Sequence, residues 1–222
     1  TAFLDIIGLI DATGNNIRFY KQVKEHEIDG DSLDGYYDNL QPVKSLKQQI
    51  EQVITLDGQI HDNASNALLK IRNNITRNES KMNEKLQHIL HSQKNQLAEQ
   101  LITIRNNRFV VPVKLSEKNN FKGTIIDYSS SGETAFMEQA LVAELNNQVS
   151  LLRMEEEREI ERILRDLTIA VADHHYPLVQ NFKILTELDA IFAKAKFAVA
   201  YDCTMPEITK SEIDEGLKVF EE

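Results

Sequence analysis

The stretch RNNRFVVPVK, residues 105–114, decides how the rest of this chain is interpreted. Its apolar residues alternate as they do in a β-strand, and one side holds Phe109, Val111 and Val113. The other side holds Val110 and Pro112. Because long segments with a helical pattern lie before and after this stretch, the fold depends on why a basic β segment stands between two helices.

The first helical segment runs from a turn at residues 57–65 to about Leu101, without a glycine or a proline. Its apolar residues recur at steps of three, four and seven, which is typical of one apolar stripe on a helix. They are Leu68, Ile71, Ile75, Met82, Leu86, Ile89, Leu90, Leu97 and Leu101. At about 1.5 Å per residue such a helix is ~60 Å long, too long for a compact domain. We therefore interpret residues 60–101 as an ascending helix.

The second helical segment runs from about Glu138 to Asp173, and we interpret residues 138–173 as a descending helix. Two steps of four meet around Glu156, as in a stutter of a coiled coil. Two one-stripe helices pair most economically in antiparallel fashion, because each then covers the apolar stripe of the other. The sequence thus predicts a mainly α fold with a small β insertion, in which a long antiparallel coiled coil forms an arm. Flanking ion pairs would fix its register.

The β-patterned insert at residues 102–137 has room for three or four short strands. Turns are predicted at Asn106-Asn107 and at Ser131-Gly132. Because Pro112 has no N–H for a strand ladder, its strand is expected to be an edge there, or bulged. The insert is therefore predicted to form a small β tip at the far end of the helix pair.

The remaining segments predict a helical core in two parts. Residues 1–59 indicate several short helices, broken at Thr13-Gly14, at residues 29–35 and before Pro42. Residues 174–206 indicate a break near Pro177 followed by a helix rich in apolar residues. Residues 207–222 are interpreted as the start of a truncated following domain. Since the chain lacks an initiator methionine, we expect it to be a fragment.

The composition is that of a soluble globular protein. Of its 222 residues, 41% are hydrophobic and 27% charged, which suffices for a core. No apolar run approaches the length of a bilayer span, and the first residues lack the features of a secretory signal. We expect a cytoplasmic protein without a membrane partner. The single cysteine, Cys203, is predicted to be a buried, inert thiol in a reducing compartment.

The net charge of −10 is distributed unevenly. Residues 60–101 and 102–137 each carry +2, whereas residues 1–59, 138–173 and 174–222 carry −5, −5 and −4. The positive charge thus lies in the middle of an acidic chain. This argues against indiscriminate coating of nucleic acid, but it permits a local contact, because exposed charges act within about 8 to 10 Å.

Five separated motifs resemble one known family. They are RNNRFVVPVK, DYSSSGETAF (127–136), ELNN (144–147), EREIERIL (157–164) and LDAIFAKAKFA (188–198). In this order they are similar to the core, lever and clamp region of the MutS-two family, the second bacterial MutS paralogue, which carries an Smr nuclease domain. The resemblance covers roughly residues 57–210, and it implies that the long antiparallel coiled coil is a lever, that the insert at residues 102–137 is a β clamp at its tip, and that the flanking segments form the helical core. The chain departs from the family's usual Asp-Gln-Ser-Ala-Ser-Gly and Ile-Glu-Pro patterns at Tyr128, Ser130 and Met137-Glu138-Gln139.

The resemblance implies a parent protein that is an ATPase, using ATP and Mg, and an endonuclease. No Gly-Lys-Ser/Thr of a phosphate-binding loop occurs in these 222 residues. We therefore expect this chain to be non-enzymatic and to bind no cofactor itself. The implied partners are DNA, as in mismatch repair and recombination suppression, or ribosomal RNA on a stalled ribosome. A homodimer of the parent is also implied.

The candidate nucleic-acid-binding residues are the basic side chains of the insert: Arg105, Arg108, Lys114, Lys118 and Lys122. Such side chains bind phosphates without reading bases. The alternative is that they only solubilise the tip or pair with Glu117, Asp127 and Glu133. Tyr128 or Phe121 would stack on an unpaired base, or else fill the core of the tip.

The sequence offers no convincing catalytic or metal site. The segment SSSG either binds an anion or forms a plain hairpin turn, and a serine nucleophile there would lack a base, since residues 102–137 contain no histidine. His174 and His175 are adjacent and so point to different helix faces, which makes a poor metal pair.

Two functions of different classes therefore compete. The first is a nucleic-acid-clamping arm. The second is a protein–protein interaction or dimerisation arm, in which Phe109, Val111, Ile125 or Phe136 would be partly exposed as an apolar patch. A free-standing enzyme is the weakest of the options.

Overall fold

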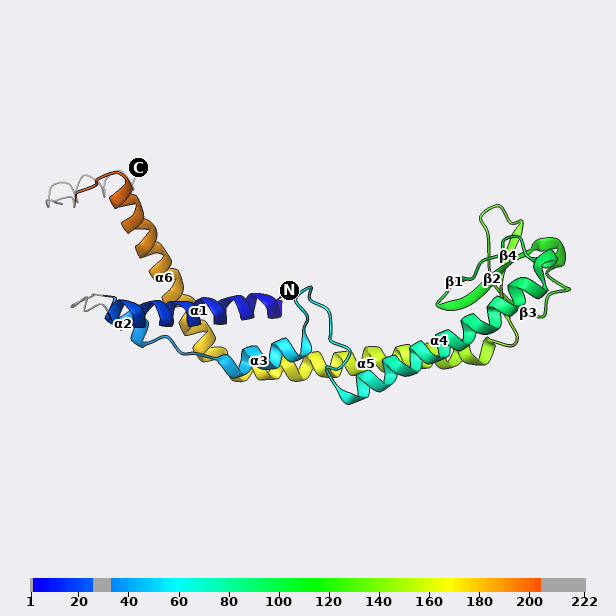
Figure 1. The fold of residues 1–222 in the computed structure, drawn as a ribbon, viewed down its shortest axis with the longest axis horizontal. Coiled ribbons are helices and arrows are strands. Elements are labelled where there is room, and N and C mark those ends of the chain that lie inside the picture. The colour runs from blue at the N-terminus through cyan, green and yellow to red at the C-terminus, as the bar shows by residue number, and fades with distance from the viewer. Residues whose placement is uncertain (1, 26–32, 205–222) are drawn as a thin grey trace, which may run out of the picture. The chain divides into compact units, whose positions relative to one another are not determined.

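The computed structural model describes residues 2–25 and 33–204. They form a mostly helical protein with one four-stranded antiparallel sheet (Figure 1). The chain divides into two compact units. Of the described residues, 2–4 and 45–173 make up one unit, here called the sheet-bearing unit, and 5–25, 33–44 and 174–204 make up the other, the helical unit.

Two long helices, α4 (Asn66–Ser92) and α5 (Ala143–Asp173), form the body of the sheet-bearing unit. They run antiparallel, because polar contacts join rising positions of α4 to falling positions of α5. Ser65 Oγ donates to Glu159 at 2.6 Å, Arg72 Nε to Glu156 at 2.7 Å, and Arg153 to Glu79 at 2.6 Å. The expected flanking ion pairs are thus present. Ser65 also accepts from Leu68 N at 3.0 Å and so caps α4. The shorter helix α3 (Lys44–Val53) precedes them.

The sheet is inserted between α4 and α5 and lies at their shared end (Figure 1). Its strands are β1 (Thr103–Arg105), β2 (Arg108–Lys114), β3 (Gly123–Tyr128) and β4 (Thr134–Gln139), in the order β1-β2-β4-β3. Short 3-10 turns occur at Lys94–Gln96 (η1) and Leu115–Glu117 (η2). The prediction of three or four strands is confirmed.

The hairpin turns use the predicted residues. Asn106 and Asn107 both have positive φ, 50° and 58°, as the tight turn between β1 and β2 requires, and Gly132 has a φ of 75°. Gly123 is needed for a different reason. A Cβ there would lie 2.3 Å from the carbonyl oxygen of Glu138, so only glycine lets β3 approach β4 this closely.

The sheet is strongly curved. Asn106 on the β1–β2 turn donates to the carbonyl oxygen of Ile126 at 3.4 Å, and Arg105 lies 3.7 Å from Asp127. Ile126 and Asp127 belong to β3, at the opposite edge of the strand order. The two edges therefore approach each other, and a register shift between Ile125 and Asp127 marks the bend in β3.

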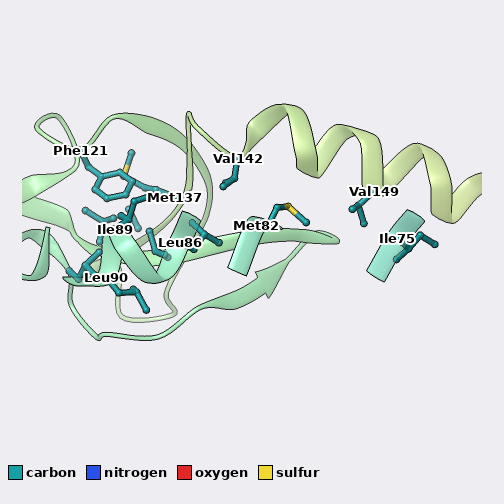
Figure 2. Close-up of a cluster of buried hydrophobic side chains, with 13 residues drawn as sticks. Ile75, Met82, Leu86, Ile89, Leu90, Phe121, Met137, Val142 and Val149 are labelled. Atoms are coloured by element: carbon teal, nitrogen blue, oxygen red, sulfur yellow. The ribbon is translucent and has the colours of Figure 1, made fainter. Parts of the chain in front are cut away.

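One hydrophobic cluster runs from the helix pair into the space beneath the sheet (Figure 2). The helices and the sheet both contribute to it. Its buried members are Ile75, Met82, Leu86, Ile89, Leu90, Leu97, Val111, Val113, Phe121, Ala135, Met137, Val142 and Val149.

The predicted end of the ascending helix is wrong. We expected helix to about Leu101, but α4 ends at Ser92. Leu97 instead forms a bridge to Val113, and Ala98 N donates to Pro112 O at 2.9 Å. Leu97 is buried in the same cluster as the helix residues, so the apolar spacing continues after the helix has ended.

The predicted start of the descending helix is also wrong. Glu138 and Gln139 belong to β4, where they pair with Thr124 and Gly123, and α5 begins at Ala143. These two residues are therefore part of a strand and not of the helix, although a long helical pattern follows them in the sequence. The far end of α5, at Asp173, lies where the sequence places it.

The strand β2 is internal in the sheet order, yet Pro112 does not interrupt a ladder. The pairing with β1 ends at Val110, opposite Thr103. The carbonyl oxygen of Pro112 points to Ala98 rather than to β4, so its nitrogen faces the side on which β1 has already ended. The residue thus behaves as an edge position, and the bulge lies in β3 instead.

The helical unit contains α1 (Ala2–Glu25), α2 (Asp34–Asp38) and α6 (His175–Ala200). The predicted break at Thr13-Gly14 is absent: α1 continues through both residues, and Thr13 Oγ1 donates to Leu9 O, one turn earlier in the same helix, at 2.8 Å. A glycine inside a helix costs only about 1 kcal/mol relative to alanine, so Gly14 is too weak a signal to end α1. The packed cluster of this unit centres on Tyr37, Leu40, Ile184 and Leu188.

A buried asparagine links α6 to the loop before α3. Asn181 is 1% exposed; it accepts from Gln41 N at 2.9 Å and donates to Gln41 O at 2.7 Å. The chain breaks between Asp38 and Lys44, as predicted before Pro42. Residues 207–222, and residues 29–32 of the other predicted break, lie outside the described residues.

Cys203 is exposed, which corrects the prediction of a buried thiol. It follows the end of α6 at Ala200, where the chain has left the packed part of the helical unit. Within residues 2–25 and 33–204, no helix is long and apolar enough to span a bilayer.

Candidate nucleic-acid interface

The five predicted cations occupy two parts of the sheet. Arg105, Arg108 and Lys114 share the face opposite Val111 and Val113, since strand residues alternate and Arg105 is paired with Arg108. Lys118 and Lys122 lie in the loop between η2 and β3. The structure thus brings three of the five to one face of the sheet.

Arg108 is committed to contacts within the protein. Its guanidinium pairs with Glu138, whose side chain is only 7% exposed, and also donates to Asn147 Oδ1. Removal of Arg108 would leave the buried carboxylate of Glu138 without a partner, which strongly destabilises a fold. The ion pair and the bond to Asn147 therefore hold β2, β4 and α5 together. Of the five cations, Arg108 has the least freedom to leave the protein for a phosphate.

The buried Asn146 extends this joint into the backbone of β2. It is 0% exposed; its Oδ1 accepts from Phe109 N at 2.9 Å, and its Nδ2 donates to Phe109 O at 3.1 Å and to Glu138 at 2.7 Å. One side-chain amide therefore takes the place of a neighbouring strand at Phe109. The segments RNNRF and ELNN meet here, which the sequence alone did not predict.

Arg105 is more accessible, with 42% of its side chain exposed. Its guanidinium lies 4.4 Å from the centre of the Phe136 ring and 3.7 Å from Asp127. The longer ion-pair distance, at exposed positions, makes this a weak pairing. The ring orients the guanidinium across the sheet while its hydrogen-bond donors remain largely available.

The three lysines are accessible and have no carboxylate partner in the part of the chain that the structure describes. Lys114 donates from Nζ to Asn95 O at 3.0 Å, which leaves its charge unneutralised. Lys122 is exposed and Lys118 half-buried. Glu117 accepts from Asn120 at 3.0 Å instead, so the expected alternative partner does not pair with a lysine.

The aromatic candidates separate clearly. Phe121 is 4% exposed and belongs to the cluster beneath the sheet, whereas Tyr128 is 49% exposed. The serines at residues 129–131 form a turn, in which Gly132 N donates to Ser129 O at 2.9 Å. Within the described residues, no three His, Cys, Asp or Glu side chains are grouped so that they could hold a metal ion.

The carboxylate of Glu159 is held by donors from both sides of the helix pair. Its carboxylate accepts from Arg162 at 2.7 Å and from Ser65 at 2.6 Å, and these bonds lower its pKa from 4.5 to about 2. Because Ser65 caps α4 and Glu159 lies on α5, this carboxylate links the two helices at the end away from the sheet.

Comparison with known proteins places the chain among bacterial relatives named endonuclease MutS2. Those of Geobacillus sp. (strain WCH70) and Halothermothrix orenii are each 41% identical, over 91% and 78% of this chain. The relative from Enterococcus faecalis is 34% identical over 91%. The chain belongs to the MutS2 family. No family model matches it.

The chain spans about a quarter of the length of the curated MutS2 relatives it matches: 26% for the first, 22% for the second and 26% for the third. The name endonuclease describes those whole proteins. What this quarter contributes to them is a separate question.

Proposed function

We propose that the sheet-bearing unit grips the phosphate backbone of nucleic acid, with α4 and α5 as a coiled-coil lever and the sheet as a clamp. The observation that carries this proposal is the division of labour among the five cations. Arg108 fixes the sheet to α5, while Arg105, Lys114, Lys118 and Lys122 keep accessible positive charge at the end of the helix pair. The MutS2 relatives, as endonucleases, act on nucleic acid.

The grip requires no base reading, because Lys and Arg on phosphates position a protein without specifying sequence. We propose that DNA, or the ribosomal RNA of a stalled ribosome, is the polymer held, and that this quarter of the protein is non-enzymatic and binds no cofactor. ATP with Mg, and the nuclease activity, would then belong to the rest of a cytoplasmic MutS2 protein. Mismatch repair or suppression of recombination is the corresponding cellular role.

The test compares two triple variants of the chain by fluorescence anisotropy with labelled duplex and single-stranded nucleic acid. The tip variant carries Arg105→Gln, Lys118→Gln and Lys122→Gln; the control carries Lys183→Gln, Lys194→Gln and Lys196→Gln on α6 and has the same net charge. Each lost phosphate contact lowers the slope of log K against log salt by about 0.9 on duplex. If the tip variant had the same affinity and the same salt slope as the control, the proposed clamp would be wrong.

A protein–protein interaction or dimerisation arm is the second candidate. Its predicted patch is reduced because Val111 is fully buried, but other apolar side chains of the tip region are exposed: Leu101, Ile104, Leu115, Tyr128 and Leu141. Sedimentation that shows a concentration-dependent dimer, unaffected by nucleic acid, would favour this candidate.

A further inference from the structure

The outer face of α4 carries a row of cations. Lys70, Arg77, Lys81 and Lys85 recur at steps of seven, four and four, so all four lie on one side of the helix. All are exposed, and they lie opposite the buried Leu68, Ile75, Met82 and Leu86. At about 1.5 Å per residue the row is ~22 Å long. We call these four residues the α4 basic row.

These cations are not neutralised by the protein. In residues 33–204, no carboxylate lies within salt-bridge distance of Lys70, Arg77 or Lys81, and Lys85 only donates to the carbonyl oxygen of Leu141, at 3.3 Å. On α5, by contrast, Arg153, Arg162 and Arg165 each pair with a carboxylate. The sequence predicted flanking ion pairs between the two long helices, but among the basic residues of α4 only Arg72 pairs with a carboxylate of α5.

The remaining residues of this face indicate which class of partner it can bind. Between Lys70 and His88 its helical positions hold only polar side chains, among them Asn73, Asn74 and one acid, Glu84. A protein–protein interface needs an apolar, often aromatic, centre, which is absent here. Binding of a single nucleic-acid strand relies on aromatic side chains that stack on bases, and this face has none. A stiff polyanion remains.

We infer that the α4 basic row is a second phosphate-binding surface, along which a nucleic-acid duplex lies. A duplex carries one charge per roughly 1.7 Å of its axis, so a stretch of ~22 Å holds about a dozen phosphates, of which those on the side toward α4 would meet the row. A straight helix holds its four cations on a line, which suits a rigid duplex backbone. This site is additional to the clamp at the sheet, although both need a polyanion.

The test uses the whole chain with Lys70→Gln, Arg77→Gln and Lys81→Gln. Glutamine keeps the helix propensity and removes the charge. The α6 control described above removes the same charge from exposed positions elsewhere. The probes are a duplex DNA, a duplex RNA and a single-stranded DNA, titrated between about 50 and 200 mM salt. Circular dichroism and thermal melts confirm that each variant is folded.

The expected result is a fall in the salt slope by about 2 to 3 on a duplex, since each of three lost contacts accounts for about 0.9. Binding to the single strand should match the control. The titrations with duplex DNA and duplex RNA identify which duplex is bound. Weaker binding of the α4 variant to either duplex supports the α4 basic row as a binding surface.

Three outcomes separate this inference from the clamp. If the α4 variant matches the control on both duplexes while the tip variant is weakened, the row is wrong and the clamp stands. If only the α4 variant is weakened, the row stands and the clamp fails. If the unmodified chain binds neither duplex, the row is overturned directly.

Discussion

The helices α4 and α5 share one apolar cluster but differ in how the charges on their outer faces are paired. Met82 of α4 and Val149 of α5 are buried in the same cluster. Outside it, three of the four arginines of α5 pair with carboxylates, whereas α4 leaves a row of cations to solvent. Burial therefore fixes how the two helices pair, while the outer faces are free to serve different purposes.

The two helices also hold the sheet differently. Besides its apolar contacts, α5 makes buried polar bonds to the sheet: Asn146 bonds to Phe109 and Glu138, and Asn147 accepts from Arg108. The attachment of α4 is apolar, through Leu86, Ile89 and Leu90. Since hydrogen bonds are directional and apolar contacts are not, the polar bonds of α5 set the orientation of the sheet, while apolar side chains of both helices cover its inner side.

The largest expected effect tests the shared cluster. Leu86→Ala, at a fully buried position, should lower the free energy of unfolding by about 2 to 5 kcal/mol, through lost burial and the cavity left behind. Urea titration followed by circular dichroism measures it. The matched control is Leu151→Ala on the exposed side of α5, expected within about 0.5 kcal/mol. Equal costs for the two variants would contradict a shared core.

The next effect tests the polar joint of α5. Asn146→Ala removes the partners of Phe109 N–H and C=O and should cost about 1 to 3 kcal/mol for each buried group left unpaired. Hydrogen exchange at the Phe109 amide should accelerate. Gln148→Ala, at an exposed position on the same helix whose side chain bonds only to Glu144 of α5, is the control. A protected Phe109 amide in Asn146→Ala would show that the joint does not hold β2.

A smaller, pH-dependent effect tests the far end of the pair. The pKa of Glu159 is lowered to about 2, so its ionised form adds stability fully above its ordinary value of 4.5. That stability is lost as the pH falls through about 2. The difference in urea midpoint between the unmodified chain and Glu159→Gln should be constant from about pH 5 to 7 and shrink below. A difference that persists unchanged at low pH would rule out this contribution.

The smallest expected effect tests the outer face of α5. Arg165→Gln breaks an exposed pair with Glu161 and should change the free energy of unfolding by less than about 0.5 kcal/mol. Binding to duplex should also be unchanged, unlike that of Lys81→Gln. If Arg165→Gln weakened binding as much as Lys81→Gln, the contrast between the two outer faces would be wrong.

The sequence predicted those features that depend on local pattern. The apolar steps of both long helices, the asparagine turn at residues 106–107 and the ion pairs between the helices all follow from spacing and residue type. Each is decided by residues close in sequence, or by two faces that must cover each other.

The features that escaped prediction depend on distant partners. The end of α4 is set by Leu97 meeting Val113, and the start of α5 by Glu138 pairing with Thr124. The role of Arg108 depends on Glu138 and Asn147, which lie 30 and 39 residues away. The unpaired state of Lys70 and Lys81 is visible only once the acids of α5 are seen to bind elsewhere. Their spacing in the sequence was the available signal.

The cluster in Figure 2 determines whether the sheet can exist without the two long helices. The inner side of the sheet, with Val111, Val113 and Met137, is completed by Leu86 and Val142, which lie outside it in the chain. Strands cut free of these helix ends would expose that side to water and should collapse or aggregate. The sheet is therefore not a portable domain; it can be transplanted or inherited only together with the ends of the two helices that cover it.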